Sequence, residues 1–143
     1  MAELGGSSQK SEAQSGGLTL ADIPAGFERA RFSSPFLDVA GPYYERQGEG
    51  GIIVATRINK GHINHIQVAH GGVLGTLADV ALSYQVHRAE KPGLPVATMN
   101  LNTNFLAGAK LGDWVEAHAV VDRIVCGDTV LMTMSAVFAI LRK

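Results

Sequence analysis

The chain has 143 residues, of which 46% are hydrophobic, so it is long enough for one domain with a substantial core. Its 12 basic and 13 acidic residues give a net charge of −1 and form no basic run, which argues against nucleic acid as a partner. The single cysteine, Cys126, excludes an internal disulfide, and no signal peptide or membrane-spanning apolar stretch is visible. We therefore expect a protein of the cytoplasm.

The N-terminal region divides into a tail and the start of a domain. Residues 1–17 are rich in Gly, Ser, Gln and Glu, and are expected to form a mobile tail. The remaining residues, 18–143, are expected to form one folded domain. Within it, a short helix is predicted over residues 19–30, interrupted by Pro24 and Gly26.

Two strands joined by a Gly-rich turn are predicted next. Turn signals at Pro35 and at Gly41-Pro42 precede them. The first strand begins at Tyr43 and ends at the sequence QGEGG, and the second follows as GIIVATRIN, which is rich in β-branched residues.

The strongest helix signal covers Gly71 to Arg88. Apolar residues occupy most of its circumference, so other parts of the protein are expected to wrap around it. Its polar residues fall on one stripe about 80° wide at 100° per residue. This stripe consists of Thr76, Asp79, Ser83 and His87.

The rest of the chain predicts strands. Residues 96–106 alternate between two faces, and Met99, Leu101, Thr103 and Phe105 share one of them. Two long strands follow, 114–125 and 129–141, joined by Cys-Gly-Asp. The predicted fold class is α+β, with an antiparallel sheet of five to six strands curled around one long helix. Since few elements remain to cover the sheet, self-association is expected.

The sequence His-Gly-Gly at the start of the long helix suggests an anion-binding helix N-terminus. Unpaired amides there carry partial positive charge, and Gly71 and Gly72 let an oxygen atom approach the backbone. Such amides could polarise a carbonyl and hold an oxyanion during acyl transfer. The alternative is structural, because the two glycines could simply allow tight packing of the turn.

Asp79 is the one acidic residue in the middle of this apolar helix. It lies eight residues after Gly71, or about 12 Å along the helix axis, so the two cannot act on one carbonyl within a single subunit. Asp79 could instead serve a site shared across a dimer, as a general base or as a nucleophile. The alternative is that its polar stripe simply faces solvent.

A metal site is not expected. His62, His65 and His70 include an H-x2-H spacing, but in an extended segment the first two point to opposite faces. The sequence contains no HExxH helix, and no base is apparent for Cys126.

The spacing N-x5-H-G-G-x6-D resembles that of hotdog-fold acyl-CoA thioesterases, and most closely the branch that includes phenylacetate-pathway thioesterases. The residues that satisfy it are Asn64, His70, Gly71, Gly72 and Asp79. The likeness extends over residues 35–143 and includes GLPVATMNLNTNFLAGAKLGD, in which Gly108 replaces the family's usual proline.

The resemblance implies a sheet wrapped around the central helix, in a homodimer often paired into tetramers. It implies that Gly71 polarises the thioester carbonyl and that Asp79 of the other subunit activates water or attacks directly. Asn64 and His70 would position the thioester or the water, with Thr98 close to that water. No separate cofactor is implied, because coenzyme A is part of the substrate.

Several positions and activities stay open at this point. Gly72 is expected to contact the substrate, and Lys110, Arg123 and Arg142 could meet coenzyme A phosphates or be ordinary surface charges. The leading activity is hydrolysis of acyl-CoA thioesters. A non-catalytic acyl-CoA sensor is the alternative, and a hotdog dehydratase is a weaker one.

Overall fold

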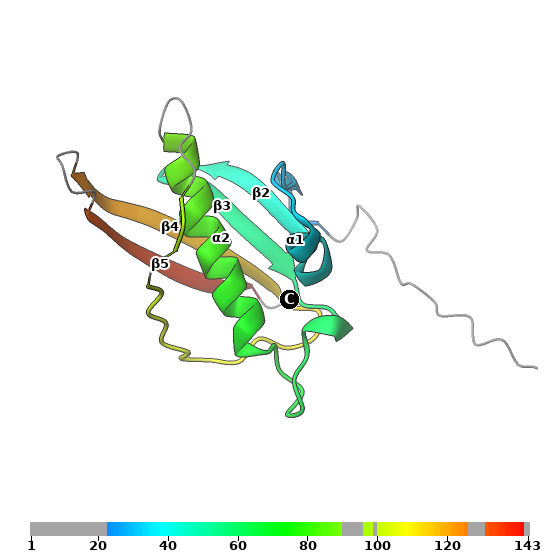
Figure 1. The fold of residues 1–143 in the computed structure, drawn as a ribbon. Helices are drawn as coiled ribbons and strands as arrows, with labels where there is room; N and C mark the ends of the chain where they lie inside the picture. The colour runs from blue at the N-terminus through cyan, green and yellow to red at the C-terminus, as the bar shows by residue number, and fades with distance from the viewer. Residues whose placement is uncertain (1–22, 90–95, 99, 126–130, 142–143) are drawn as a thin grey trace, which may run out of the picture.

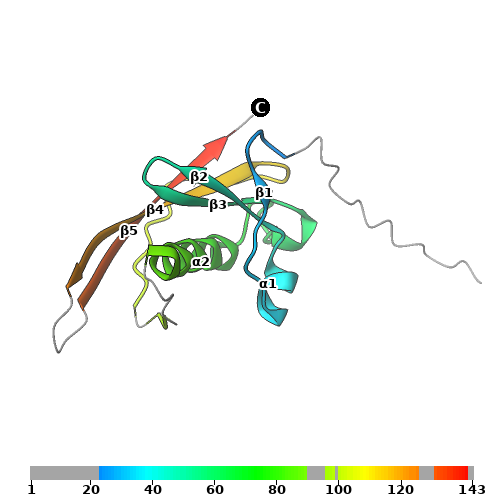
Figure 2. The same cartoon turned by 90° about the horizontal axis from the view of Figure 1, so that it is seen from above.

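The computed structural model describes residues 23–89, 96–98, 100–125 and 131–141. Within these ranges, a five-stranded antiparallel sheet runs in the order β1-β2-β3-β4-β5 and curves around the long helix α2 (Figure 1). The short helix α1 lies on the same side of the sheet as α2 (Figure 2). The elements are β1 (Glu28–Arg29), α1 (Pro35–Ala40), β2 (Tyr43–Gly48), β3 (Gly51–Arg57), the 3-10 turn η2 (Lys60–His62), α2 (Gly71–Ala89), β4 (Trp114–Val125) and β5 (Leu131–Leu141).

Both faces of the sheet are covered in its central part. The main core lies between the sheet and α2, where Val54 and Val115 meet Leu77. A smaller cluster on the opposite face joins Trp114 to Phe27, whose rings lie 5.1 Å apart. Because β3 is covered on both sides, its residues from Ile52 to Thr56 are all buried.

The predicted central helix and most strands are confirmed. The helix predicted over 71–88 is α2, and the strands β2, β3, β4 and β5 lie where the sequence placed them. The α+β class is confirmed, with four strands of six residues or more and the two-residue β1 in the described part of the chain. Over the same residues, no helix combines the length and the apolar character needed to cross a membrane.

The helix predicted over 19–30 is wrong in its described part. Pro24 and Gly26 form a turn instead, in which the Phe27 amide donates to the Pro24 carbonyl at 3.2 Å and Gly26 has φ +84°. The chain then pairs as β1 with β2. The prediction failed because proline and a glycine at positive φ end a helix rather than interrupt it.

The strand predicted over 96–106 is also wrong within one subunit. Its described residues, 96–98 and 100–106, belong to no strand, and Leu106 is 94% exposed. Alternation alone does not make a strand, because the backbone groups need a neighbouring strand to bond. In the described sheet β5 is an edge strand, paired on one side only, with β4.

Helix α1 was missed by the sequence analysis, which saw only turn signals there. Ser34 caps this helix, since its hydroxyl accepts a hydrogen bond from the Leu37 amide at 3.2 Å, and Pro35 occupies its first turn. A serine followed by proline is a helix-start signal that the reading of Pro35 as a turn overlooked. The predicted tail over residues 1–17, Cys126 and Arg142 lie outside the described residues.

The turn between β2 and β3 is fastened to α2 by one side chain. The amide oxygen of Gln85 accepts a hydrogen bond from the Ile52 backbone at 2.8 Å, and its nitrogen donates to the Gly50 carbonyl at 3.3 Å. Gly51 has φ +127°, and a β-carbon there would lie 1.9 Å from the Gln85 amide nitrogen. The turn therefore needs glycine at this position for both conformation and space.

We expect Gly51→Ala to lower the free energy of unfolding by about 3 kcal/mol, because backbone strain adds to the clash with Gln85. Gly50→Ala is the matched control, since a β-carbon at Gly50 would meet nothing within 4 Å. It should change stability by less than about 0.5 kcal/mol. Urea unfolding followed by circular dichroism measures both variants, and equal stability of the two would contradict this account of the turn.

Candidate functional site

A buried histidine shapes the loop that leads into α2. His62 is 3% exposed, and its ring nitrogen Nε2 lies 3.0 Å from the Ala40 carbonyl and 3.1 Å from that of Gly41, at the end of α1. Its own carbonyl accepts a hydrogen bond from the His70 amide at 2.7 Å. His62 is thus a structural residue that joins the end of α1 to the residue before α2.

His70 caps the start of α2. Its Nδ1 accepts a hydrogen bond from the Gly72 amide at 2.9 Å, so in the neutral ring the proton lies on Nε2. The neighbouring Gly71 amide is not used: none of the contacts among the described residues engages it. One amide at this helix N-terminus is therefore free for a ligand oxygen, while the amide of Gly72 is occupied.

The ring of Phe105 lies close to Gly71, the residue whose amide is free. A β-carbon built on Gly71 would come within 3.3 Å of the Phe105 Cζ atom. A side chain at Gly71 would therefore require this ring, which is itself 58% exposed, to shift by a few tenths of an ångström. The close approach of Phe105 therefore favours glycine at this position.

Asp79 lies two turns further along α2 and is half-buried. Its carboxylate accepts a hydrogen bond from the hydroxyl of Thr98, so the structure brings these two predicted site residues together. The helical rise between Gly71 and Asp79 is about 12 Å, which confirms that they cannot meet at one carbonyl within a subunit.

A groove runs along α2 with Asp79 near its middle. One cavity, of about 580 Å³, and a second, of about 440 Å³, share Leu37, Asp79 and Val80 in their walls. The polar stripe of α2 faces this groove, because Thr76, Asp79, Ser83 and His87 all line one cavity or the other. Its residues therefore form a candidate site rather than a plain solvent face.

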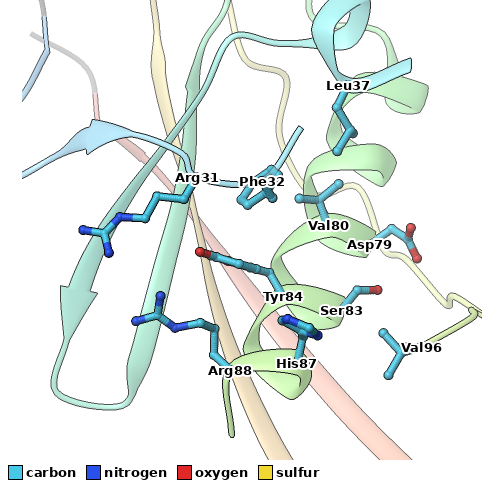
Figure 3. A pocket seen from close by; sticks show the side chains of 10 residues that line it. All are labelled: Arg31, Phe32, Leu37, Asp79, Val80, Ser83, Tyr84, His87, Arg88 and Val96. Carbon is cyan, nitrogen blue, oxygen red and sulfur yellow. The ribbon is translucent and has the colours of Figure 1, made fainter. Parts of the chain in front are cut away.

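The larger cavity has aromatic walls and a basic end. Figure 3 shows Asp79 at one end and the guanidinium groups of Arg31 and Arg88 at the other, with the Tyr84 hydroxyl turned toward them. The rings of Phe32 and Tyr84 pack edge to face with centroids 4.6 Å apart. Burial, followed by a hydrogen bond to the Glu45 carboxylate, raises the pKa of Tyr84, so its hydroxyl remains a donor at neutral pH.

Asn64 acts on the loop rather than in the groove. Its side-chain oxygen accepts hydrogen bonds from the amides of Ile66 at 3.0 Å and Val68 at 3.3 Å. The backbone amide of Asn64 also donates a hydrogen bond to the Val68 carbonyl at 2.8 Å. Asn64 thereby fixes the turn that delivers His70 to the helix start.

Two basic residues, Lys110 and Arg123, were predicted to contact coenzyme A. Lys110 is exposed in the turn before β4, where its amide donates to the Asp113 carboxylate at 2.8 Å. Arg123 follows a register shift in β4, and its side chain lies outside the described part of the chain. In the described residues, no three His, Cys, Asp or Glu side chains form a group that could hold a metal ion.

Three polar residues that line the larger cavity could not be assigned to a site from the sequence: Arg31, Tyr84 and Arg88. Arg31 lies far from α2 in the chain, and only the fold places it beside the last turn of that helix. A partial signal existed, because Tyr84 and Arg88 are four residues apart and share a helix face with each other.

Comparisons with known proteins identify the family. A family model described as "Thioesterase superfamily" matches residues 66–125. The chain is 42% identical over 104 residues to "Putative esterase PA0474" of Pseudomonas aeruginosa, and the match covers 72% of this chain and 78% of that protein. The chain belongs to the thioesterase superfamily, as its resemblance implied.

Solved structures show the same fold. A phenylacetic acid degradation-related protein of Ralstonia eutropha superposes with a TM-score of 0.57 at 19% identity, covering 77% of this chain and 92% of that one. The protein BH2602 of Bacillus halodurans, solved with CoA, gives a TM-score of 0.56 at 21% identity, covering 80% and 83%. The expected hotdog fold, an antiparallel sheet around a long helix, is thereby confirmed.

The capping role of His70 can be tested through stability. We expect His70→Ala to lower the free energy of unfolding by about 1 kcal/mol, because the Gly72 amide loses its acceptor. His70→Asn should stay within about 0.5 kcal/mol of the wild type, since asparagine caps helices well. Urea unfolding compares the three proteins, and an unchanged His70→Ala variant would show that the imidazole does not stabilise the helix start.

Proposed function

We propose that this protein hydrolyses acyl-CoA thioesters in a site formed by two copies of the chain. The observation that carries the proposal is the pair of groups on α2: a free amide at Gly71 and, about 12 Å further along, the groove-facing carboxylate of Asp79. The amide of one subunit polarises the thioester carbonyl, and Asp79 of the other subunit activates water.

The chemistry follows from these groups. Asp79 accepts a proton from water, whose oxygen attacks the carbonyl carbon, and the resulting oxyanion is stabilised by the Gly71 amide and the helix N-terminus. The carbon–sulfur bond then breaks, and coenzyme A leaves as the thiol with the transferred proton. Thr98 orients the carboxylate by its hydrogen bond, and His70 Nε2 can donate to the substrate. No separate cofactor is needed.

The surface supports the pairing of subunits. Large apolar side chains are exposed on the two segments that flank the groove, including Phe36 and Val39 of α1 and Phe105 and Leu106 before β4. Exposed apolar surface of this kind is typical of an interface between chains. We infer a homodimer, or a dimer of dimers, in which the segment 96–106 and the free edge of β5 are covered.

The nature of the leaving group rests on family membership and on one neighbour. Thioesterase superfamily membership supports a thioester hydrolase, and BH2602, which shares the fold, was solved with CoA. Lys110 and Arg123 are our candidates to meet the phosphates of coenzyme A, with the Gly72 backbone beside the thioester.

Asp79→Asn is expected to lower kcat by about 10²- to 10⁴-fold, because the amide cannot accept the proton of the attacking water. Release of free thiol from a panel of acyl-CoA substrates of different length and aromaticity measures the loss. Glu49→Gln, at the exposed tip of the β2–β3 turn, is the matched control and should leave turnover unchanged. Wild-type turnover in Asp79→Asn would refute the mechanism.

Gly71→Pro tests the amide and the shared site together. Proline is well tolerated at the first position of a helix and removes the N–H, so the variant should fold but lose about 10²- to 10³-fold in kcat. Gly71→Ala, whose β-carbon meets the same Phe105 ring but which keeps the N–H, is the matched control and should keep most of its turnover. Unfolding and refolding a mixture of Gly71→Pro and Asp79→Asn chains should restore about one quarter of wild-type activity, because mixed dimers contain one intact site. Absence of this recovery, with mixed dimers demonstrated by mass spectrometry, would show that the site is not shared.

A further inference from the structure

The larger cavity beside Asp79 is lined by apolar side chains in its middle and by basic side chains at the end far from Asp79. Its middle is apolar and aromatic, with Phe32, Leu37 and Val80 in the wall. The pantetheine arm of coenzyme A carries two amides, and amides without hydrogen-bond partners are costly to bury. Methylene groups of an acyl chain fit this wall better, so the cavity is best explained as the acyl side of the proposed site.

The far end of the cavity contains two arginines in different electrostatic states. Arg31 is already paired, with Glu28 and, at 3.5 Å, with the buried Glu45. Arg88 is exposed, and the ion pairs of the described residues include none that uses it. Its guanidinium lies over the Tyr84 ring, 5.8 Å from the centroid. Among the described residues, one positive charge at the end of an apolar cavity therefore has no carboxylate in an ion pair with it.

Arg31 and Tyr84 lie at the same end of the cavity as Arg88. The buried Glu45 carboxylate accepts a hydrogen bond from the Arg31 backbone amide at 3.1 Å, so the segment that carries Arg31 is held at the cavity. The Tyr84 hydroxyl is turned toward the same end (Figure 3). Because this hydroxyl is hydrogen-bonded to the Glu45 carboxylate, the Arg88 guanidinium is the group at this end that would bind a ligand carboxylate.

We propose that the acyl pocket selects acyl groups whose far end carries a carboxylate, with Arg88 as the residue that determines this preference. The inference rests on the proposed function, because it places the thioester at Asp79. The helical rise from Asp79 to Arg88 is about 14 Å, and the arginine side chain can reach back over part of it. A dicarboxylic acyl chain of medium length spans the remainder.

The test compares octanoyl-CoA with suberyl-CoA, the analogue of equal carbon number that ends in a carboxylate. Kinetics of thiol release give kcat/KM, and calorimetry on Asp79→Asn protein gives the affinity for the intact thioesters without requiring turnover. With Arg88 in place, we expect both kcat/KM and affinity to favour suberyl-CoA by about tenfold, which is the effect of one charge-assisted hydrogen bond.

Two variants assign the preference to its residue. Arg88→Gln should reduce the affinity for suberyl-CoA by about tenfold and remove the preference. Arg29→Gln is the matched control: Arg29 also lies over a tyrosine ring, that of Tyr44, at 5.8 Å, but does not line the cavity. It should retain the full preference for the carboxylate.

Three results would overturn the inference. Equal affinity of octanoyl-CoA and suberyl-CoA would show that the cavity does not select a carboxylate. Equal effects of Arg88→Gln and Arg29→Gln would remove the assignment to Arg88. Weaker binding of free coenzyme A by Arg88→Gln would place the coenzyme A phosphates at this end instead. A protein that prefers to bind suberyl-CoA but hydrolyses neither thioester would support the pocket and refute the proposed function, so the two failures are distinguishable.

Discussion

The fixed rise of an α-helix is the constraint on which this site depends. Gly71 and Asp79 belong to one rigid, largely buried element, and eight residues of helix hold them about 12 Å apart. No side-chain rotation can bring them to the same carbonyl. Any chemistry that uses both groups therefore requires a second α2 alongside the first, so the proposed reaction and the proposed assembly depend on each other.

The groove owes its properties to the contrast between the two sides of α2. Leu77, Ala81 and Leu82 are buried against the sheet, which leaves a narrow polar stripe on a helix that is otherwise apolar. That stripe faces a cavity that is partly closed by α1 and by the segment between β1 and α1. Leu37 of α1 and Phe32 of this segment supply apolar walls. A carboxylate in such surroundings is less solvated than one on an open surface, and its interactions with a bound substrate are correspondingly stronger.

The central helix, the four long strands and the helical separation of Gly71 from Asp79 could be predicted from the sequence, because each rests on local periodicity or spacing. The pattern could not reveal the hydrogen bond from Thr98 to Asp79, although the family resemblance placed Thr98 close to the water that Asp79 would activate. Residues 96–106 show the limit of periodicity: the alternation is correct, but a strand also needs a neighbour, and none is provided within one subunit. Arg31 joins the groove only through the fold, which no local pattern encodes.

His62 has a mechanical consequence for the groove. Its ring holds the carbonyls that end α1, while its own backbone holds the residue that caps α2. The wall formed by α1 and the turn that carries the Gly71 amide are thus joined through the buried imidazole of His62, and the Asn59 side chain adds a second hydrogen bond to the Gly41 carbonyl. We expect a ligand that displaces α1 to shift the backbone beside Gly71 as well, because both segments are hydrogen-bonded to His62.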